Sequence, residues 1–170
     1  ADAQIIARLK NDPKERAENI MITDLVRNDL SKSALPGSVK VEELCQIYSF
    51  QTVHQMISTI TARYPENISF SKILADTFPM GSMTGAPKVR AMELIDELEL
   101  GARGLYSGAV GYVDPAGDFD FNVVIRSLQY NAQTHYLSAM VGSAVTALAN
   151  AETEYEECLL KADALFKALN

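Results

Sequence analysis

Three strand-like segments follow one another without an intervening helix in the second half of the chain. They are YSGAVGYV (106–113), DFDFNVVIRSLQY (118–130) and THYLSAMVGSAV (134–145), and their apolar residues recur at a spacing near two. The short segments between them, 114–117 (DPAG) and 131–133 (NAQ), have the composition of turns. Strands joined by short turns pair antiparallel, so this half of the chain predicts a three-stranded meander.

Helical patterns surround these strands. Asp12, Pro13 and Glu15 form a helix start, because aspartate caps, proline suits the first helical position and an acid three residues after the cap completes a capping box. That helix is expected to end near residue 30. Other segments are predicted as follows: helical or frayed at 1–11, strand or helical turn at 38–50, strand at 53–64, and helices at 70–78, 88–100 and from about 150 onward.

The order of these elements predicts an α+β fold, because the strands cluster instead of alternating with helices. No internal repeat or Gly/Ser-rich linker interrupts the sequence. We therefore expect residues 1–170 to belong to one domain with no internal boundary.

Composition excludes several classes of function. The net charge of −7 disfavours nonspecific nucleic-acid binding, because no surplus of cations is present to release counterions from phosphates. No apolar run approaches the roughly 20 residues that a membrane-spanning helix needs. Cys45 and Cys158 are too few for a disulfide framework, and the N-terminal residues resemble neither a signal nor a transit peptide. A cytoplasmic protein with no nucleic-acid or membrane partner is the expectation.

Two pairs of acids lie at helical spacing. Glu15 and Glu18 share one face of the first long helix, and Glu154 and Glu157 share one face of the last, with Lys161 one turn further on. Each pair alone is typical of a solvated helix surface. Because two helices carry such pairs, the acids can also hold one Mg²⁺ ion from opposite sides.

The segment GSMTGAPK (81–88) precedes a predicted helix. Backbone N–H groups at the helix start, with the hydroxyls of Ser82 and Thr84, form a candidate anion site. The pattern is not a P-loop, because GxxxxGK[ST] is absent. A tight connector whose glycines serve only the backbone is the alternative.

Single residues among the strands are further candidates. Arg126 lies within an apolar strand pattern, where it binds a carboxylate, occupies an edge position or forms a structural ion pair. Tyr106 opens a neighbouring strand, and Gly142 near the end of the third allows close backbone approach to a ligand or marks a bulge. His54 among apolar strand residues fits a structural role as well as a catalytic one.

In this order, these features resemble the C-terminal part of the chorismate-utilising enzymes. That family includes anthranilate synthase component I, aminodeoxychorismate synthase component I, isochorismate synthase and salicylate synthase. The matching stretches are KERAENIMITDLVRNDL, GSVKVEEL, TVHQMIST, FPMGSMTGAPKVRAMELIDELE, LYSGAVGY, FNVVIRSL and AETEYEECLLKADAL. Within the family, RAEN (16–19) and SMTGAPK (82–88) favour aminodeoxychorismate synthase component I.

The resemblance implies roles for individual residues. It makes Glu18 and Glu157 ligands of Mg²⁺, and Glu15 and Glu154 supporting acids around the metal's waters. It also implies that Arg126 and Tyr106 hold the enolpyruvyl carboxylate of chorismate, and that Gly142 contacts the substrate through its backbone. Lys161 would be a cation near the ring carboxylate. His54 would line the ring site as the catalytic candidate, and Ser82 would supply a hydroxyl from the loop. Chorismate is a dianion, so magnesium and the two cations would balance both its charge and that of the glutamates.

The resemblance also implies a fold and a reaction. The fold is two packed layers of antiparallel sheet with outer helices, of which this chain is only the C-terminal part. The reaction converts chorismate and ammonia to 4-amino-4-deoxychorismate on the route to para-aminobenzoate and folate, with ammonia from a glutamine amidotransferase subunit. Anthranilate, isochorismate or salicylate synthesis is the alternative within the family, and a non-catalytic binding fragment is the alternative outside it.

Two features depart from the family pattern. Ala144 replaces a second glycine after Gly142, and ALAN (147–150) replaces the usual ADS-type stretch. The lysine of a PIKGT-like motif, which lies upstream in the family and acts as nucleophile, has no counterpart in these residues. We therefore expect the isolated chain to be inactive.

Overall fold

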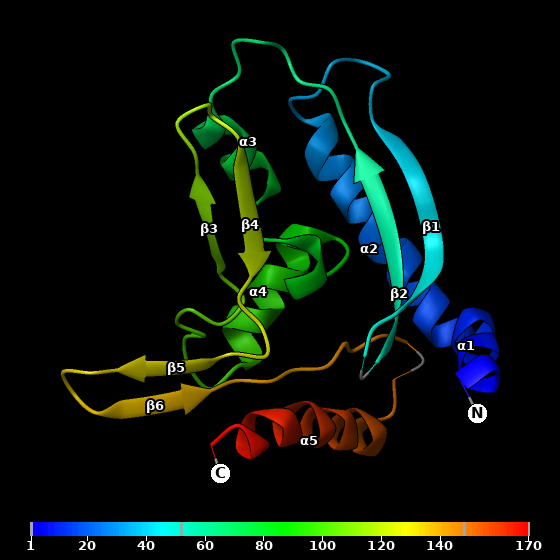
Figure 1. Ribbon diagram of the computed structural model, residues 1–170, viewed down its shortest axis with the longest axis vertical. Helices are drawn as coiled ribbons and strands as arrows, with labels where there is room; N and C mark the ends of the chain where they lie inside the picture. Colours follow the sequence, from blue (N-terminus) through cyan, green and yellow to red (C-terminus); the bar gives the residue numbers. More distant parts are fainter. Residues whose placement is uncertain (1, 52, 148, 170) are drawn as a thin grey trace. The chain divides into compact units, whose positions relative to one another are not determined.

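The computed structural model describes residues 2–51, 53–147 and 149–169 (Figure 1). The chain forms two compact units, Ala1–Leu98 and Glu99–Asn170, which are considered separately below. This division concerns packing within each unit, so the expectation of one domain over 1–170 stays a prediction.

The helices of the first unit follow the sequence pattern. They are α1 (Asp2–Asn11), α2 (Pro13–Ser31), α3 (Phe70–Thr77), the short 3₁₀ helix η1 (Gly81–Met83) and α4 (Lys88–Leu98). Asp12 caps α2 as predicted, because its side chain accepts hydrogen bonds from Lys14 N at 2.9 Å and Glu15 N at 3.1 Å. This cap fixes where α2 begins, and therefore where Glu15 and Glu18 lie on its first turns.

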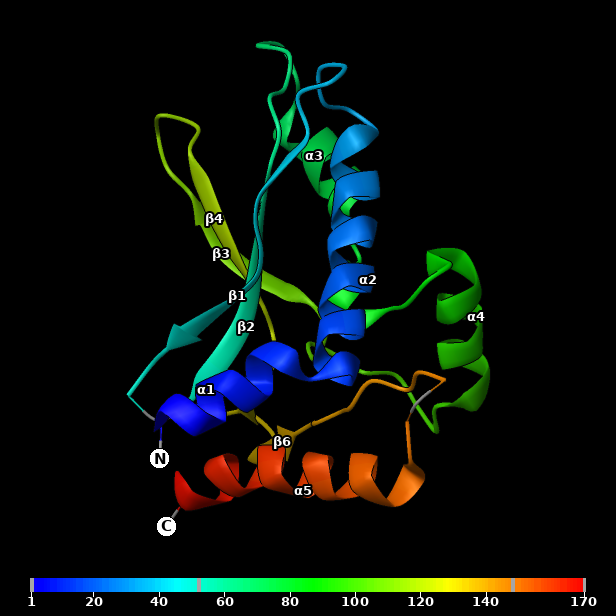
Figure 2. The ribbon, with the colours of Figure 1, turned by 90° about the vertical axis from the view of Figure 1, so that its right-hand side faces the viewer.

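A long antiparallel hairpin packs along α2. It consists of β1 (Lys40–Ser49) and β2 (His54–Thr61), whose register runs from Lys40 opposite Thr61 to Ser49 opposite His54. Both views show the hairpin beside α2 (Figures 1 and 2). The segment that the sequence left open between strand and helical turn is thus a strand. Its register shifts between Glu43 and Gln46, and Cys45 there has a φ of +53°, which marks a bulge.

The strands of the second unit correct the predicted meander. They are β3 (Ala109–Val113), β4 (Phe119–Val123), β5 (Leu128–Asn131) and β6 (Tyr136–Ala139). They form two separate two-stranded ladders, β3–β4 and β5–β6, instead of one three-stranded sheet. The predicted strand 118–130 breaks because Ile125 N bonds back to Val123 O at 3.0 Å and Arg126 turns to a φ of +51°.

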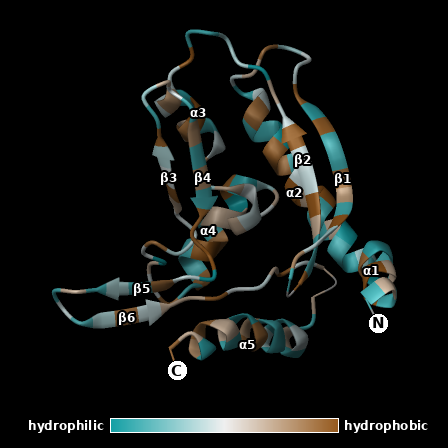
Figure 3. Cartoon of the chain, viewed as in Figure 1, coloured by the Kyte–Doolittle hydropathy of each residue, from teal (hydrophilic) through white to brown (hydrophobic). Residues whose placement is uncertain are grey.

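The predicted turns and final helix are present. Asp114 accepts hydrogen bonds from Ala116 N and Asp118 N, both at 2.9 Å, and Gly117 takes a φ of +92°, which glycine adopts without strain. Asn150 caps α5 (Ala151–Lys167) through bonds from Glu152 N and Thr153 N at 3.1 and 3.2 Å. Hydrophobic and hydrophilic residues both occur along α5 (Figure 3), and Leu165 is its buried apolar residue.

Helices and antiparallel strands thus make up both units, which confirms the α+β class. The packing of sheets into two layers stays a prediction. Within the part of the chain that the structure describes, no helix is both long and apolar enough to cross a bilayer.

Candidate active site

Glu15, Glu18 and His54 come together in the first unit. They line an open cavity of about 280 Å³ between α2 and the start of β2, with Leu9, Asn19, Ile22, Gln55 and Met56. Glu15 is exposed, whereas Glu18 is half-buried with its Oε1 atom 3.8 Å from Lys14 Nζ. The structure therefore places three of the predicted site residues, two acids and an imidazole, around one hollow.

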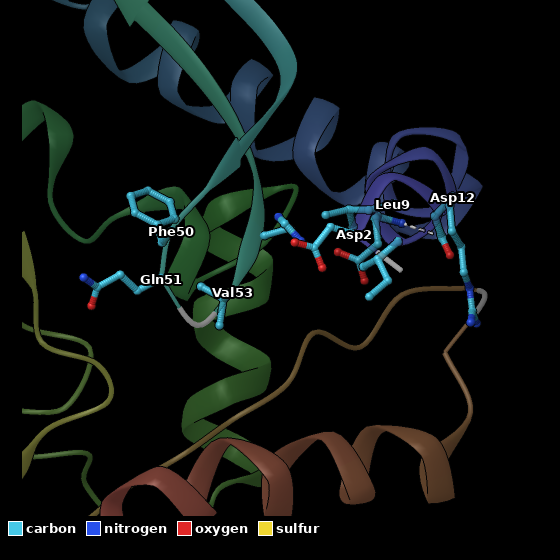
Figure 4. Close-up of a pocket in the computed structure, with 10 residues that line it drawn as sticks. Asp2, Leu9, Asp12, Phe50, Gln51 and Val53 are labelled. Atoms are coloured by element: carbon cyan, nitrogen blue, oxygen red, sulfur yellow. Dashed lines mark hydrogen bonds between the residues drawn. The ribbon is translucent and has the colours of Figure 1, made fainter.

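A larger cavity of about 650 Å³ adjoins these residues. Glu15 and His54 line it too, and Figure 4 shows it between α1, which contributes Asp2 and Leu9, and the turn that joins β1 to β2, which contributes Phe50, Gln51 and Val53. Both cavities are open at the surface of the first unit. Charged and polar side chains line their walls together with apolar ones.

His54 is held by its neighbour across the hairpin. Its Nδ1 atom lies 2.8 Å from Ser49 Oγ, and the two residues face each other in the strand register. The imidazole is half-buried. This contact fixes the ring at the wall shared by the two cavities.

Asn19 is a residue of this site that sequence reasoning missed. Its Oδ1 atom accepts hydrogen bonds from Ser58 Oγ and, at 3.4 Å, from Cys45 Sγ, and its Nδ2 atom donates to Met56 O at 3.3 Å. These bonds tie α2 to both strands of the hairpin at the bulge, directly beside Glu18. The RAEN motif contained the residue, but nothing in the sequence indicated partners so far along the chain.

Ser82 lies apart from the two cavities. It is exposed on η1, whereas the preceding Gly81 is buried against α2. A Cβ atom added at Gly81 would lie 2.9 Å from Leu25 Cβ, so this close packing requires glycine. The loop is thus held to α2 with its hydroxyl outward, and it lines neither of the two cavities.

Gly142, Lys161 and Tyr106 are neighbours in the second unit. Lys161 Nζ donates a hydrogen bond to Gly142 O at 3.0 Å, and a Cβ atom added at Gly142 would lie 2.8 Å from Tyr106 Oη. Gly142 lies in the segment after β6 and not in a strand as predicted, and the group close to it is the Tyr106 hydroxyl. The predicted approach of a ligand to its backbone stays a prediction.

The charges around Tyr106 come from several residues. Burial raises the pKa of Tyr106 above its usual value, and the positive charges of Arg103 and Arg126 oppose that rise. Arg103 Cζ lies 5.9 Å from the centre of the Tyr106 ring, and the Arg103 guanidinium also donates a hydrogen bond to Ser107 Oγ at 3.1 Å. Arg103 was not among the residues predicted from the sequence, because it lies outside every motif that was identified there.

The two acids of α5 that were predicted as site residues both have partners. Glu154 is buried and accepts a hydrogen bond from Ser143 Oγ, while Glu157 forms an ion pair with Lys161. Lys161 thus joins Glu157 to the Gly142 carbonyl. Both acids lie on one face of the helix, as their spacing predicted.

The structure corrects the setting of Arg126. It was predicted within a strand, but it is exposed in the connection between β4 and β5, with left-handed backbone. The β-branched and apolar residues before it favour a strand locally, and tertiary context ends that strand at Val123. The guanidinium remains near enough to Tyr106 to affect its pKa.

The predicted metal ligands are divided between the units, Glu15 and Glu18 in one and Glu154 and Glu157 in the other. In residues 2–51, 53–147 and 149–169, no three His, Cys, Asp or Glu side chains gather into a metal-binding group. The chemistry of the donors fits Mg²⁺, which prefers carboxylate oxygens. Whether the two pairs share one ion stays a prediction.

Comparison with known proteins identifies relatives over nearly the whole chain. Aminodeoxychorismate synthase component 1 of Salmonella typhimurium is 45% identical over 169 residues, which are 99% of this chain and 37% of that protein. Anthranilate synthase component 1 of Mycobacterium bovis is 42% identical over 168 residues, which are 99% of this chain and 32% of that protein. The chain therefore spans about a third of the length of these relatives.

A solved structure has the same fold. Anthranilate synthase component I from Streptococcus pneumoniae superposes with a TM-score of 0.81 at 32% identity, covering 95% of this chain and 37% of that one. Residues 1–167 match the family described as chorismate binding enzyme. The chain belongs to the family of chorismate binding enzymes.

Proposed function

We propose that this chain forms part of the active site of an aminodeoxychorismate synthase component I. The similarity to such a protein, 45% identity across 99% of the chain, carries the proposal. The reaction would convert chorismate and ammonia to 4-amino-4-deoxychorismate on the route to para-aminobenzoate and folate. In the full polypeptide the chain would act as the portion that binds substrate and metal.

Cations of the second unit would bind the carboxylates of the substrate. Arg126 is exposed, and its planar guanidinium suits bidentate recognition of the enolpyruvyl carboxylate beside the Tyr106 hydroxyl. Lys161 donates to the Gly142 carbonyl at 3.0 Å, so its ammonium group is already oriented toward that backbone. We assign Lys161 to the ring carboxylate and Gly142 to a backbone contact with the substrate.

The glutamates would hold Mg²⁺. We assign Glu18 and Glu157 as direct ligands, and Glu15 and Glu154 as acceptors for the waters on the ion, because carboxylate oxygens match its preference. When bound, Mg²⁺ supplies stabilisation of the negative charge that develops as the C4 hydroxyl group leaves. Glu154 is held by Ser143 and Glu157 by Lys161, so both of these assigned acids are oriented by neighbours.

His54 and Ser82 would act from the first unit. Ser49 engages the Nδ1 atom of His54, so we assign Nε2 to face the ring of the substrate. Ser82 would offer its exposed hydroxyl from the loop. These assignments give the first unit a proton-transferring group and a hydrogen-bond donor.

The partner of this reaction would be a glutamine amidotransferase subunit that supplies ammonia. A cytoplasmic setting suits both the reaction and Cys45 and Cys158, which are free thiols in the structure. We propose no nucleic-acid or membrane partner.

Anthranilate synthase component I is the second candidate. The 42% identity to such a protein favours it, and its substrate would occupy the same residues. The two functions differ in their products, so product identification separates them.

The decisive experiment is an assay of the full polypeptide that carries this chain, with chorismate, magnesium and ammonia. The expected product, identified by mass and fluorescence, is 4-amino-4-deoxychorismate. Formation of anthranilate would replace the proposal with the second candidate. The isolated 170-residue chain is expected to give no turnover, and measurable turnover would contradict the role assigned to the remaining part of the enzyme.

A pair of variants tests the metal ligands. Glu157→Gln removes a carboxylate assigned to Mg²⁺, so the concentration of magnesium needed for half-maximal activity should rise. Glu156→Gln is the matched control, because Glu156 is its exposed neighbour and has no assigned role. An equal response of both variants to magnesium would remove Glu157 from the ligand set.

A further inference from the structure

The loop between α3 and α4 is fastened to α2 at two points. Buried Gly81 packs against Leu25, and Lys88 Nζ forms an ion pair with Asp29. Leu25 and Asp29 are four residues apart and share one face of α2. Exposed Ser82 lies between the two fastening points along the chain.

Lys88 also closes the loop upon itself. Its Nζ atom donates a hydrogen bond to Pro79 O at 2.7 Å, nine residues earlier in the chain. One ammonium group therefore joins the two ends of the loop and attaches both to α2. Because the Lys88 ammonium group already binds Asp29 and Pro79 O, its role is to hold the loop in place and not to bind an anion of the substrate.

The pair between Lys88 and Asp29 is largely shielded from solvent. The side chain of Asp29 is 6% exposed and that of Lys88 15%. The second carboxylate oxygen of Asp29 accepts from Lys32 Nζ at 2.9 Å, and Lys32 also donates to Asp76 O of α3 at 3.1 Å. Without Lys88, Asp29 would keep its ion pair with Lys32 but lose the cation that reaches it from the loop, and the loss of a partner from a largely buried network is more disruptive than the loss of a surface pair.

We propose that Lys88 and Asp29 are positioning residues that keep the loop, and with it Ser82, in a fixed place relative to the acids of α2. The inference rests on the proposed function for the role of Ser82 and Glu18, but the fastening itself does not depend on the substrate. Helix α2 connects the two, because it carries Glu15 and Glu18 at its start and Asp29 near its end.

The test compares Lys88→Met with Lys88→Arg in the full polypeptide. Hydrogen exchange of the loop amides in residues 80–86 reports on the fastening, and kcat and KM for chorismate report on its use. In Lys88→Met, exchange of these amides should accelerate by about tenfold or more, because the loop opens locally, while amides inside α2 keep their rates. KM should rise about tenfold with a smaller change in kcat, and Lys88→Arg should restore both within about threefold.

Two further variants keep the test decisive. Asp29→Asn preserves shape and one acceptor, so it replaces Lys88→Met if that variant does not fold. Lys167→Met is the control, because its ion pair with Asp163 lies on the surface with the lysine 75% exposed. Unchanged loop exchange in Lys88→Met or Asp29→Asn would overturn the fastening, and faster exchange with unchanged KM would overturn the positioning role. If the parent enzyme does not turn over chorismate, the proposed function fails, and loop exchange alone decides the fastening.

Discussion

Ser143 donates a hydrogen bond to the buried carboxylate of Glu154, eleven residues ahead on the first turn of α5. The bond ties the irregular segment after β6, which contains Gly142, back onto the helix that carries Glu154, Glu157 and Lys161. Within the second unit, the segment with the assigned backbone contact is therefore held to the helix that carries the two assigned acids.

Ser143→Ala should destabilise the protein and weaken its response to magnesium. The substitution removes a donor from a buried carboxylate, which costs about 1–3 kcal/mol. Urea unfolding measures the loss of stability, and a magnesium titration of chorismate turnover measures the functional effect. Ser127→Ala is the control, because Ser127 forms a local hydrogen bond, to Ile125 O at 2.8 Å. Equal behaviour of the two variants would show that the bond to Glu154 has no special role.

Gly142→Ala should disturb Tyr106. The new Cβ atom would lie 2.8 Å from Tyr106 Oη, so the phenol must move away. Overpacking of this kind costs about 1–3 kcal/mol, and we expect KM for chorismate to rise about tenfold. In a Tyr106→Phe background the oxygen is absent, so the added methyl group should change KM by less than about threefold. The same penalty in both backgrounds would place the clash elsewhere.

Asp12→Ala should shorten or loosen the start of α2. Two backbone N–H groups lose their acceptor, and the loss of such a cap costs about 1 kcal/mol. For a chain of this size we expect the Tm to fall by about 2–4 °C in a thermal melt. Asp12→Asn retains the side-chain acceptor and should keep the Tm near that of the parent. A Tm for Asp12→Ala equal to that of Asp12→Asn would contradict the role of the cap.

Asp76 should contribute to stability at neutral pH and lose that contribution in acid. Hydrogen bonds from Lys72 and Ser33 hold the pKa of Asp76 below its usual value. A carboxyl with a lowered folded-state pKa is stabilising above its unfolded pKa of about 3.9, and the contribution disappears as the pH falls through the folded-state pKa.

Urea unfolding at about pH 7 and about pH 3 checks this expectation. The difference in stability between the two conditions should be smaller in Asp76→Asn than in the parent. Asp24→Asn is the control, because its ion pair with Arg27 is exposed, with side chains 65% and 53% accessible. An unchanged difference in Asp76→Asn would exclude Asp76 as a source of acid sensitivity.

The features that the sequence predicted correctly depend on neighbours within a few residues. The predicted cap at Asp12 involves residues two and three positions ahead, and the predicted start of the last helix near residue 150 coincides with a local cap of the same kind at Asn150. Helical spacing likewise placed Glu15 with Glu18, and Glu154 with Glu157, on common faces. Local hydrogen bonding and periodicity determine these features, so they can be predicted from the sequence without knowledge of the tertiary structure.

The features that escaped prediction depend on distant residues. Lys88 and Asp29 are 59 residues apart, and Asn19 reaches Ser58 across 39 residues. The break at Arg126 lies in a run whose alternation is typical of one continuous strand, so only the three-dimensional context reveals it. The two pairs can be identified from the tertiary structure and not from the sequence, because no regular spacing relates their members.

The left-handed backbone of Arg126 carries a consequence for attempts to make this protein more heat-resistant. An L-residue with a Cβ atom is disfavoured there by about 1–2 kcal/mol, and glycine avoids that penalty. A screen that rewards survival at high temperature alone would therefore enrich glycine or asparagine at this position. The most heat-stable variants would be those that had lost a guanidinium assigned to the substrate. At this one residue, a gain in thermal stability would therefore be accompanied by a loss of substrate binding.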